Sequence, residues 1–328
     1  MCKIKLAFIF WFSLAFYSLC FGQDAGQTNG QINGQTKEVA ITIDDLPLVG
    51  SRSKTPADVQ RTHDRFMQIV QTLIDHKVPA TGFIIAGSIG KDQWQLLELF
   101  RDKGFILGNH TYTHMNLARI SAEKYIADVD KADQIIQPLF NGPKYFRYPY
   151  LAEGTGAKRQ KVYDYLAAHH YIIAPITIDS KDYQFNARVY AIPYRLRPQG
   201  LGGLKKRYLA YVQKQILRAE AQAKGQNQTN TKQILLVHSN LLNSYFLGDV
   251  LDMFEKNGYK FISLEEALKA PAPIINTPIQ QDGPNKDMPA DAPAENDETT
   301  SLLDSNFIQT LLKIDAPAFK QTNYLLVR

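Results

Sequence analysis

The sequence predicts an α/β fold built on a parallel sheet, and three observations support this. Of the 328 residues, 45% are hydrophobic and 21% are charged, which suits a large core and excludes a disordered chain. Short apolar runs alternate with helical patterns about seven times between residues 37 and 270. Acidic residues, histidines and an arginine follow several of these runs, where α/β barrels place their active sites. The alternation fits either a (β/α) barrel or an open, doubly wound sheet.

The expected elements follow one another in a regular order. The apolar runs predict strands at residues 39–43, 81–86, 105–108, 145–148, 171–178, 234–237 and 259–263. Helical patterns predict helices at 55–76, 93–103, 121–137, 158–169, 205–224 and 249–256, and a last short helix follows the final strand. Thr55 followed by Pro56 is typical of a helix start, because a capping side chain there precedes a proline at the first helical position.

The flanks differ in composition from this body. Lys3 and Lys5, an apolar run from 6 to 21 and Gly22 form the pattern of a secretory signal peptide; a single N-terminal membrane anchor is the alternative. The pattern predicts export to the periplasm or the medium, with no stable membrane span after cleavage. The expected organisation is a signal peptide at 1–22, a flexible leader at 23–36, a catalytic domain at 37–270, a Pro/Asp-rich linker at 271–300 and a helical tail at 301–328.

Cysteine usage and charge narrow the chemistry. Cys2 and Cys20 both lie in the predicted signal peptide, so cleavage near Gly22 would leave a protein without cysteine. Disulfides, cysteine–zinc sites, iron–sulfur clusters and thiol nucleophiles are then excluded, and any metal must be held by His, Asp or Glu. A net charge of +5 is too small to indicate nucleic-acid binding. It suits an anionic envelope polymer, although an ordinary solvated surface explains it equally well.

Two histidines and two aspartates suggest a metal site. His110 and His114 are four residues apart, so on a helical turn both rings would point to one side and could hold one ion. Asp44 and Asp45 end an apolar strand, where adjacent side chains point in different directions, so one can bind metal while the other reaches a water molecule. A set of two His and one Asp fits hydrolytic zinc and also non-haem iron.

Five short motifs occur in the order found in one family. They are Ile41-Thr-Ile-Asp44-Asp45, His110-Thr-Tyr-Thr-His114, Arg147-Tyr-Pro149-Tyr150, Asp179-Ser-Lys-Asp182-Tyr183 and Leu236-Val-His238. In this order the chain resembles the polysaccharide deacetylase (NodB homology) family, carbohydrate esterase family 4. The resemblance implies a distorted (β/α) barrel of about seven parallel strands and a metal-dependent hydrolase that removes acetyl groups from sugar polymers.

The resemblance also implies roles for individual residues. Asp44 would be the general base, and Asp45, His110 and His114 would hold the metal. Zn²⁺ is the expected ion, with Co²⁺, Ni²⁺ or Fe²⁺ as alternatives.

The remaining motifs would supply the acid and the substrate contacts. Arg147 would tether the base, Asp182 would orient His238 as general acid, and the backbone N–H of Tyr150 would help to bind the oxyanion. Substrate contacts are expected from Pro149, Tyr150 and Tyr183.

The chain departs from the family pattern around the groove. Leu46 and Leu151 stand where the family has Gly, and Tyr183 stands where it has Trp. The insertion at 184–232 is expected to narrow or cap a polymer cleft.

Three functions are compatible with these residues. The first is removal of N-acetyl groups from an N-acetylhexosamine polymer or oligomer of the chitin or peptidoglycan type. The second is O-acetyl ester hydrolysis on xylan or another acetylated glycan. The third is a non-catalytic glycan-binding envelope protein, which retains the fold only. The sequence makes no prediction of oligomeric state.

Overall fold

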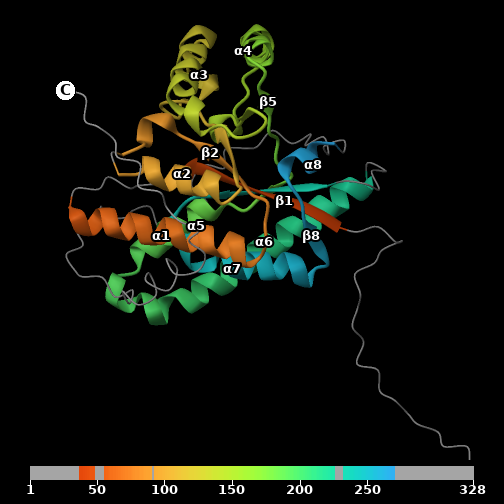
Figure 1. Ribbon diagram of the computed structural model, residues 1–328. Helices are drawn as coiled ribbons and strands as arrows, with labels where there is room; N and C mark the ends of the chain where they lie inside the picture. The colour runs from red at the N-terminus through yellow and green to blue at the C-terminus, as the bar shows by residue number, and fades with distance from the viewer. Residues whose placement is uncertain (1–36, 49–54, 91, 226–231, 270–328) are drawn as a thin grey trace, which may run out of the picture.

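The computed structural model describes residues 37–48, 55–90, 92–225 and 232–269 (Figure 1). The predicted signal peptide, leader, linker and C-terminal helix lie outside these described residues. None of the described helices combines the length and the hydropathy that a membrane crossing needs.

A parallel sheet forms the centre of the domain. Its strands are β1 (Lys37–Leu46), β2 (Thr81–Ile84), β3 (Ile106–Asn109), β4 (Tyr145–Phe146), β5 (Ile172–Ile173), β6 (Ile178–Asp179), β7 (Gln233–His238) and β8 (Tyr259–Phe261). Seven strands follow the order β5-β4-β3-β2-β1-β7-β6, and β8 pairs with the start of β1. The path curls into a half-barrel, and in the described residues no strand pairing joins β5 to β6. The expected parallel, distorted barrel is therefore confirmed.

The helices pack around this sheet in two groups (Figure 1). Longer helices are α1 (Pro56–Asp75), α2 (Trp94–Asp102), α3 (Ala122–Ile136), α4 (Gly156–Ala168), α5 (Asp182–Ala191), α6 (Arg197–Gly225) and α7 (Leu241–Lys256). Short ones are η1 (Ala86–Ser88), η2 (Leu117–Arg119), η3 (Gln137–Leu139), η4 (Pro149–Leu151), η5 (Tyr194–Leu196) and α8 (Leu264–Leu268). Helices α1, α5, α6 and α7 pack together, whereas α3 and α4 form a separate pair.

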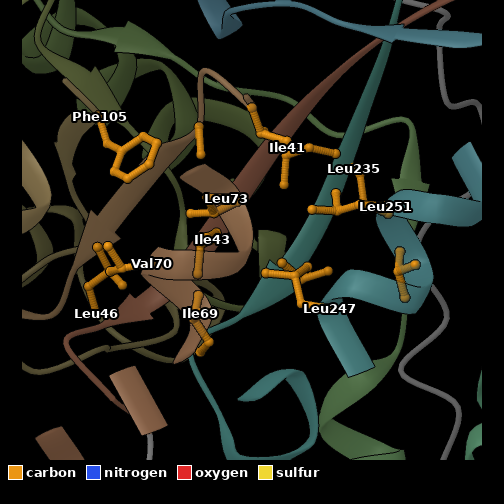
Figure 2. Close-up of a cluster of buried hydrophobic side chains, with 14 of the residues drawn as sticks. Ile41, Ile43, Leu46, Ile69, Val70, Leu73, Phe105, Leu235, Leu247 and Leu251 are labelled. Carbon is orange, nitrogen blue, oxygen red and sulfur yellow. The ribbon is translucent and has the colours of Figure 1, made fainter. Parts of the chain in front are cut away.

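Side chains of β1 alternate between the two faces of the sheet, so one face contributes to the apolar core and the other to a polar interior. Ile41 and Ile43 pack with Leu73 of α1 and Leu247 of α7 in the main apolar cluster (Figure 2). Because successive side chains point to opposite faces of a strand, Thr42 and Asp44 face the other side. Both are buried, so the inner face of the half-barrel carries polar groups that need partners.

The predicted strand at 171–178 is wrong as a single element. It divides into β5 and β6, which lie at opposite ends of the sheet. Pro175 explains the break, because proline has no N–H to give to a sheet ladder. Residues 174–177 therefore cross from one end of the path to the other.

The predicted insertion at 184–232 and the segment after β7 contain more helix than the sequence predicted. Helix α5 was not expected, α6 begins at Arg197 instead of 205, and α7 begins at Leu241 instead of 249. Helix α6 packs against α5, β6 and α7, and buries Leu204 and Tyr208 in the main core. At its far end Glu220 accepts hydrogen bonds from Lys37 and Tyr259, next to the start of β1.

Candidate active site

Two of the expected residues are neighbours across adjacent strands. In the β1–β7 register Asp44 is the partner of His238, so the general base and general acid named above lie at the same end of two paired strands. Asp45 departs from regular strand alternation: its φ is 64°, and the pairing register shifts between Ile43 and Leu46. Aspartate tolerates this left-handed conformation, which directs its carboxylate to the same histidine as Asp44.

The His110–His114 segment is a loop, and the expected helical turn is wrong. Residues 110–116 are not helical, and Thr111 and His114 have φ values of 66° and 57°. The His114 N–H donates to the Thr111 hydroxyl at 3.0 Å, which closes the loop. The two rings therefore meet with centroids 4.9 Å apart by loop closure, not by helical periodicity.

Asp45, His110 and His114 converge as one candidate group of metal ligands. The Nε2 atoms of His110 and His114 each lie 3.4 Å from Oδ1 of Asp45. That oxygen is buried without a hydrogen-bond partner among the described residues. The three donor atoms lie within 4.8 Å of one another, as the ligands of one ion would.

The His110 tautomer supports this assignment. Its Nδ1 lies 2.7 Å from the carbonyl oxygen of Arg147, which only accepts, so Nδ1 carries the proton. The lone pair of a neutral His110 is then on Nε2 and faces the Asp45 carboxylate. Two facing acceptors repel unless a cation lies between them, so the residues fit a divalent ion.

Burial and neighbouring charges keep these groups in metal-binding form. Burial lowers the pKa of His114, the nearby His110 lowers it further, and the result is about 4 despite the opposing Asp45. Burial raises the pKa of Asp45, but the neighbouring His110, His238 and His114 more than offset this, so the pKa is lowered. At neutral pH Asp45 is therefore a carboxylate and His114 a neutral imidazole, the forms that bind a metal.

Arg147 is enclosed in the half-barrel beside Asp44. Its Nη1 lies 3.5 Å from Oδ1 of Asp44, while Nε donates to the Ala174 carbonyl at 2.7 Å. Nη2 donates to the Thr42 hydroxyl at 3.1 Å and to the Pro175 carbonyl at 3.5 Å. Oδ2 of Asp44 lies 3.7 Å from Nε2 of His110, so the same carboxylate is next to the metal ligands. Arg147 therefore places its guanidinium beside Oδ1 of Asp44, the oxygen that does not face His110, and among the described residues neither Nη1 nor Oδ1 has a hydrogen-bond partner.

His238 and Asp182 form a tightly bound pair. The Nδ1–H of His238 donates to Oδ1 of Asp182 at 2.6 Å, and its backbone N–H donates to Oδ2 at 2.7 Å. The side-chain amides of Asn240 and Asn243 donate to Oδ2 at 2.9 and 2.5 Å. Four donors hold the buried Asp182 carboxylate in place.

This environment favours the protonated form of His238. Burial lowers its pKa, but the charge and hydrogen bond of Asp182 act more strongly in the other direction and raise the pKa from 6.5 to about 10. Because Nδ1–H is held by Asp182, Nε2 is the ring atom left to serve a substrate.

Two exposed tyrosines stand at the rim. The Tyr150 ring lies against His114 with centroids 4.6 Å apart, and 59% of Tyr150 is exposed. The Tyr183 ring meets His238 edge-on at 5.9 Å and is 48% exposed. Pro149 is buried at the start of η4, so its part here is to shape the turn that presents Tyr150.

The sequence did not predict several residues that hold the site residues in position. Thr42 holds Arg147, Asn240 and Asn243 hold Asp182, and the buried Asn109 accepts from the Thr111 N–H at 2.7 Å. Asn109 precedes His110 directly and Asn240 follows His238 by two positions. That adjacency to motif residues was the signal available in the sequence.

A second group of ligand types, His76, Asp252 and Glu255, joins α1 to α7. Here Nε2 of His76 faces Asp252 at 3.8 Å and Nδ1 faces Glu255 at 3.6 Å. Donors on opposite sides of a ring do not converge on one ion, so this geometry suits an ion-pair contact between helices.

Comparison with known proteins places the geometry in a family. Residues 31–169 match the family described as Polysaccharide deacetylase. A peptidoglycan-N-acetylglucosamine deacetylase from Bacillus cereus is 27% identical over 148 residues, which is 45% of this chain and 46% of that protein. A chitin deacetylase from Arthroderma benhamiae is 29% identical over 108 residues, 32% of this chain and 28% of that protein. The chain thus spans less than half of either relative.

A solved structure supports the fold. The crystal structure of a mutant of BA3943, described as a CE4 family pseudoenzyme, aligns with a TM-score of 0.50 at 19% identity, covering 71% of this chain and 67% of that one. The family match ends before Asp182 and His238, so it contains Asp44 and the candidate metal ligands but not the candidate acid pair. Within residues 31–169, the chain is similar to the polysaccharide deacetylase family.

Proposed function

We propose that this protein is a metal-dependent hydrolase that removes N-acetyl groups from an N-acetylhexosamine polymer or oligomer outside the cytoplasm. The observation that carries the proposal is the buried, unpartnered Oδ1 of Asp45 facing Nε2 of His110 and His114. Asp44 stands beside this set and His238 lies on the neighbouring strand, so ligands, base and acid occupy one place.

The residues divide the reaction between them. A divalent ion held by Asp45, His110 and His114, with Zn²⁺ as the expected metal, would lower the pKa of water and polarise the acetyl carbonyl. Asp44, held in position by Arg147, accepts the proton of the attacking water. The backbone N–H of Tyr150 donates to the carbonyl oxygen as negative charge develops on it.

The final step is collapse of the tetrahedral adduct with loss of the amine. An amine leaves poorly without a proton, and Nε2–H of His238 is placed to supply one. Its raised pKa keeps this proton available at neutral pH. The exposed rings of Tyr150 and Tyr183 offer surfaces on which sugar rings can stack.

The experiment measures acetate release from N-acetylglucosamine oligomers and from peptidoglycan fragments by the zinc-loaded protein. We expect Asp44→Asn to lower kcat about 10²- to 10⁴-fold, because it removes the base and leaves the ligands in place. Unchanged kcat in this variant would exclude Asp44 as the base. Absence of hydrolysis across both substrates, despite bound zinc, would favour a non-catalytic glycan-binding protein.

The effect of removing His238, the proposed general acid, distinguishes amide hydrolysis from ester hydrolysis. An alcohol leaves more readily than an amine, so His238→Ala should reduce amide hydrolysis far more than hydrolysis of an acetylated xylan. Equal losses on the two substrates would contradict His238 as the acid, and a wild-type protein that is active on acetylated xylan but not on amide substrates would support the O-acetyl esterase instead.

A further inference from the structure

Asp128 accepts hydrogen bonds from the loop that carries His110 and His114 (residues 110–116, the histidine loop) but is not itself one of the candidate metal ligands. It lies on α3, is 8% exposed, and its Oδ2 accepts the backbone N–H groups of Tyr112 and Thr113 at 3.1 and 3.0 Å. Its Oδ1 accepts the Thr113 hydroxyl at 2.8 Å. All three bonds go to the segment between the two histidines.

The loop needs such a partner because it is not helical. Its backbone groups have none of the internal bonds that a helical turn would supply. The carbonyls of Thr111 and Tyr112 accept from the N–H groups of Ala86 and Gly87 in η1 at 3.0 and 2.8 Å. Asp128 satisfies the N–H groups that point the other way, so the loop is held between η1 and α3.

This arrangement fixes the spacing of the two imidazoles. The loop bends at Thr111 and His114, both in the left-handed region that side chains other than glycine rarely adopt. Without partners on both sides, the amides at 112 and 113 would seek water and the bend would relax. His114, at the far end of the bend, is the ligand whose position would then change most.

We propose that Asp128 is a positioning residue for the metal site, acting through the backbone of the loop and not as a ligand. The inference rests on the proposed metal set of Asp45, His110 and His114. It assigns to α3, an element that contributes no ligand, a direct effect on how tightly the site binds a divalent cation. Partners beyond the ligands themselves change metal affinity by about 10- to 100-fold when removed.

The test measures zinc affinity of the full chain by competition with a chromophoric chelator, together with the visible absorption of the Co²⁺-loaded protein. Asp128→Ala removes both acceptor oxygens, so the loop amides of Tyr112 and Thr113 and the Thr113 hydroxyl lose their partner. We expect zinc affinity to fall about 10- to 100-fold and the Co²⁺ spectrum to change. Asp130→Ala is the matched control, because Asp130 is on the same helix and bonds to Gln134 and Tyr165 instead of the loop.

The outcomes separate this inference from the proposed function. Wild-type affinity and spectrum in a folded Asp128→Ala, or equal losses in Asp130→Ala, would overturn the positioning role. If Asp128→Ala does not fold, Thr113→Val decides: it removes the hydroxyl bond from an exposed position, and we expect at least a threefold loss, with unchanged affinity counting against the inference. Zinc affinity that His114→Ala leaves unchanged would instead contradict the metal set itself.

Discussion

Single residues in this site depend on partners that come from distant parts of the chain. Arg147 donates hydrogen bonds to Thr42 in β1 and to the Ala174 carbonyl in the segment that crosses the half-barrel. Asp182 accepts hydrogen bonds from His238 in β7 and from Asn243 near the start of α7. Each is a buried charge, and removing one partner of such a group leaves the other uncompensated. The chemistry therefore relies on residues that never touch a substrate.

Asp182 sets the protonation of His238, and this can be measured. The pKa of His238 is raised above its value of 6.5 in the unfolded chain, so it stays protonated until the pH approaches about 10. Asp182→Asn removes the charge, so we expect the alkaline limb of kcat/KM for amide substrates to move to lower pH. The His238 ring resonances, followed by NMR against pH, should show the same direction. An alkaline limb at the wild-type position would assign that limb to another group.

The sequence predicted which residues meet at the candidate site but not the residues that hold them. The motifs were sufficient to select Asp44, Asp45, His110, His114 and His238, which the structure brings together. Asn240, Asn243 and Asp128 could not be predicted in this way, since they bond to particular backbone or carboxylate atoms. Only the folded structure shows which atoms those are.

At the scale of elements, short segments determine how the ligands are presented. η1 touches the histidine loop so closely that Gly87 has no room for a side chain: a Cβ there would lie 2.4 Å from the Tyr112 carbonyl oxygen. That atom is backbone, so the loop itself would have to shift. The predicted helix start at α1 is confirmed, because Thr55 caps the first turn. The predicted strand at 171–178 is wrong, because one proline divides the apolar run.

Gly87→Ala should therefore weaken both the fold and the metal site. We expect a loss of about 1–3 kcal/mol in unfolding free energy from the overpacked contact, and lower zinc affinity because the carbonyl bond to the loop is displaced. Urea unfolding and chelator competition measure the two effects. Gly202→Ala is the control, since nothing lies within 4 Å of that position in α6 and alanine favours a helix. Equal zinc affinity in the two variants would show that η1 does not hold the loop.

At the scale of the whole molecule, the metal set joins the ends of two strands. Asp45 ends β1 and the histidines follow β3, with β2 between them. An ion bound there would tie these strands together in the folded state alone. Ligand binding of this kind stabilises by mass action, by about 2.7 kcal/mol at a concentration one hundred times Kd.

Zinc should therefore raise the Tm of the intact protein, and removing it with a chelator should reverse the change. Calorimetry with and without zinc tests this, and we expect His114→Ala to lose the increase. His76→Ala, in the second group of ligand types, should keep it. The opposite pattern in the two variants would move the metal to the contact between α1 and α7.

The sheet order has a consequence for how the activity is assembled during folding. Strands β1 to β5 lie beside one another in chain order, so the metal ligands and Asp44 come together from pairings that are close in sequence. His238 lies on β7, which pairs with β1 although the two strands are nearly two hundred residues apart in sequence. Contacts so distant in sequence form slowly. A nascent chain stopped before β7 would hold every ligand of the ion and lack the acid. The proposed amide cleavage would therefore require that β7 has paired with β1.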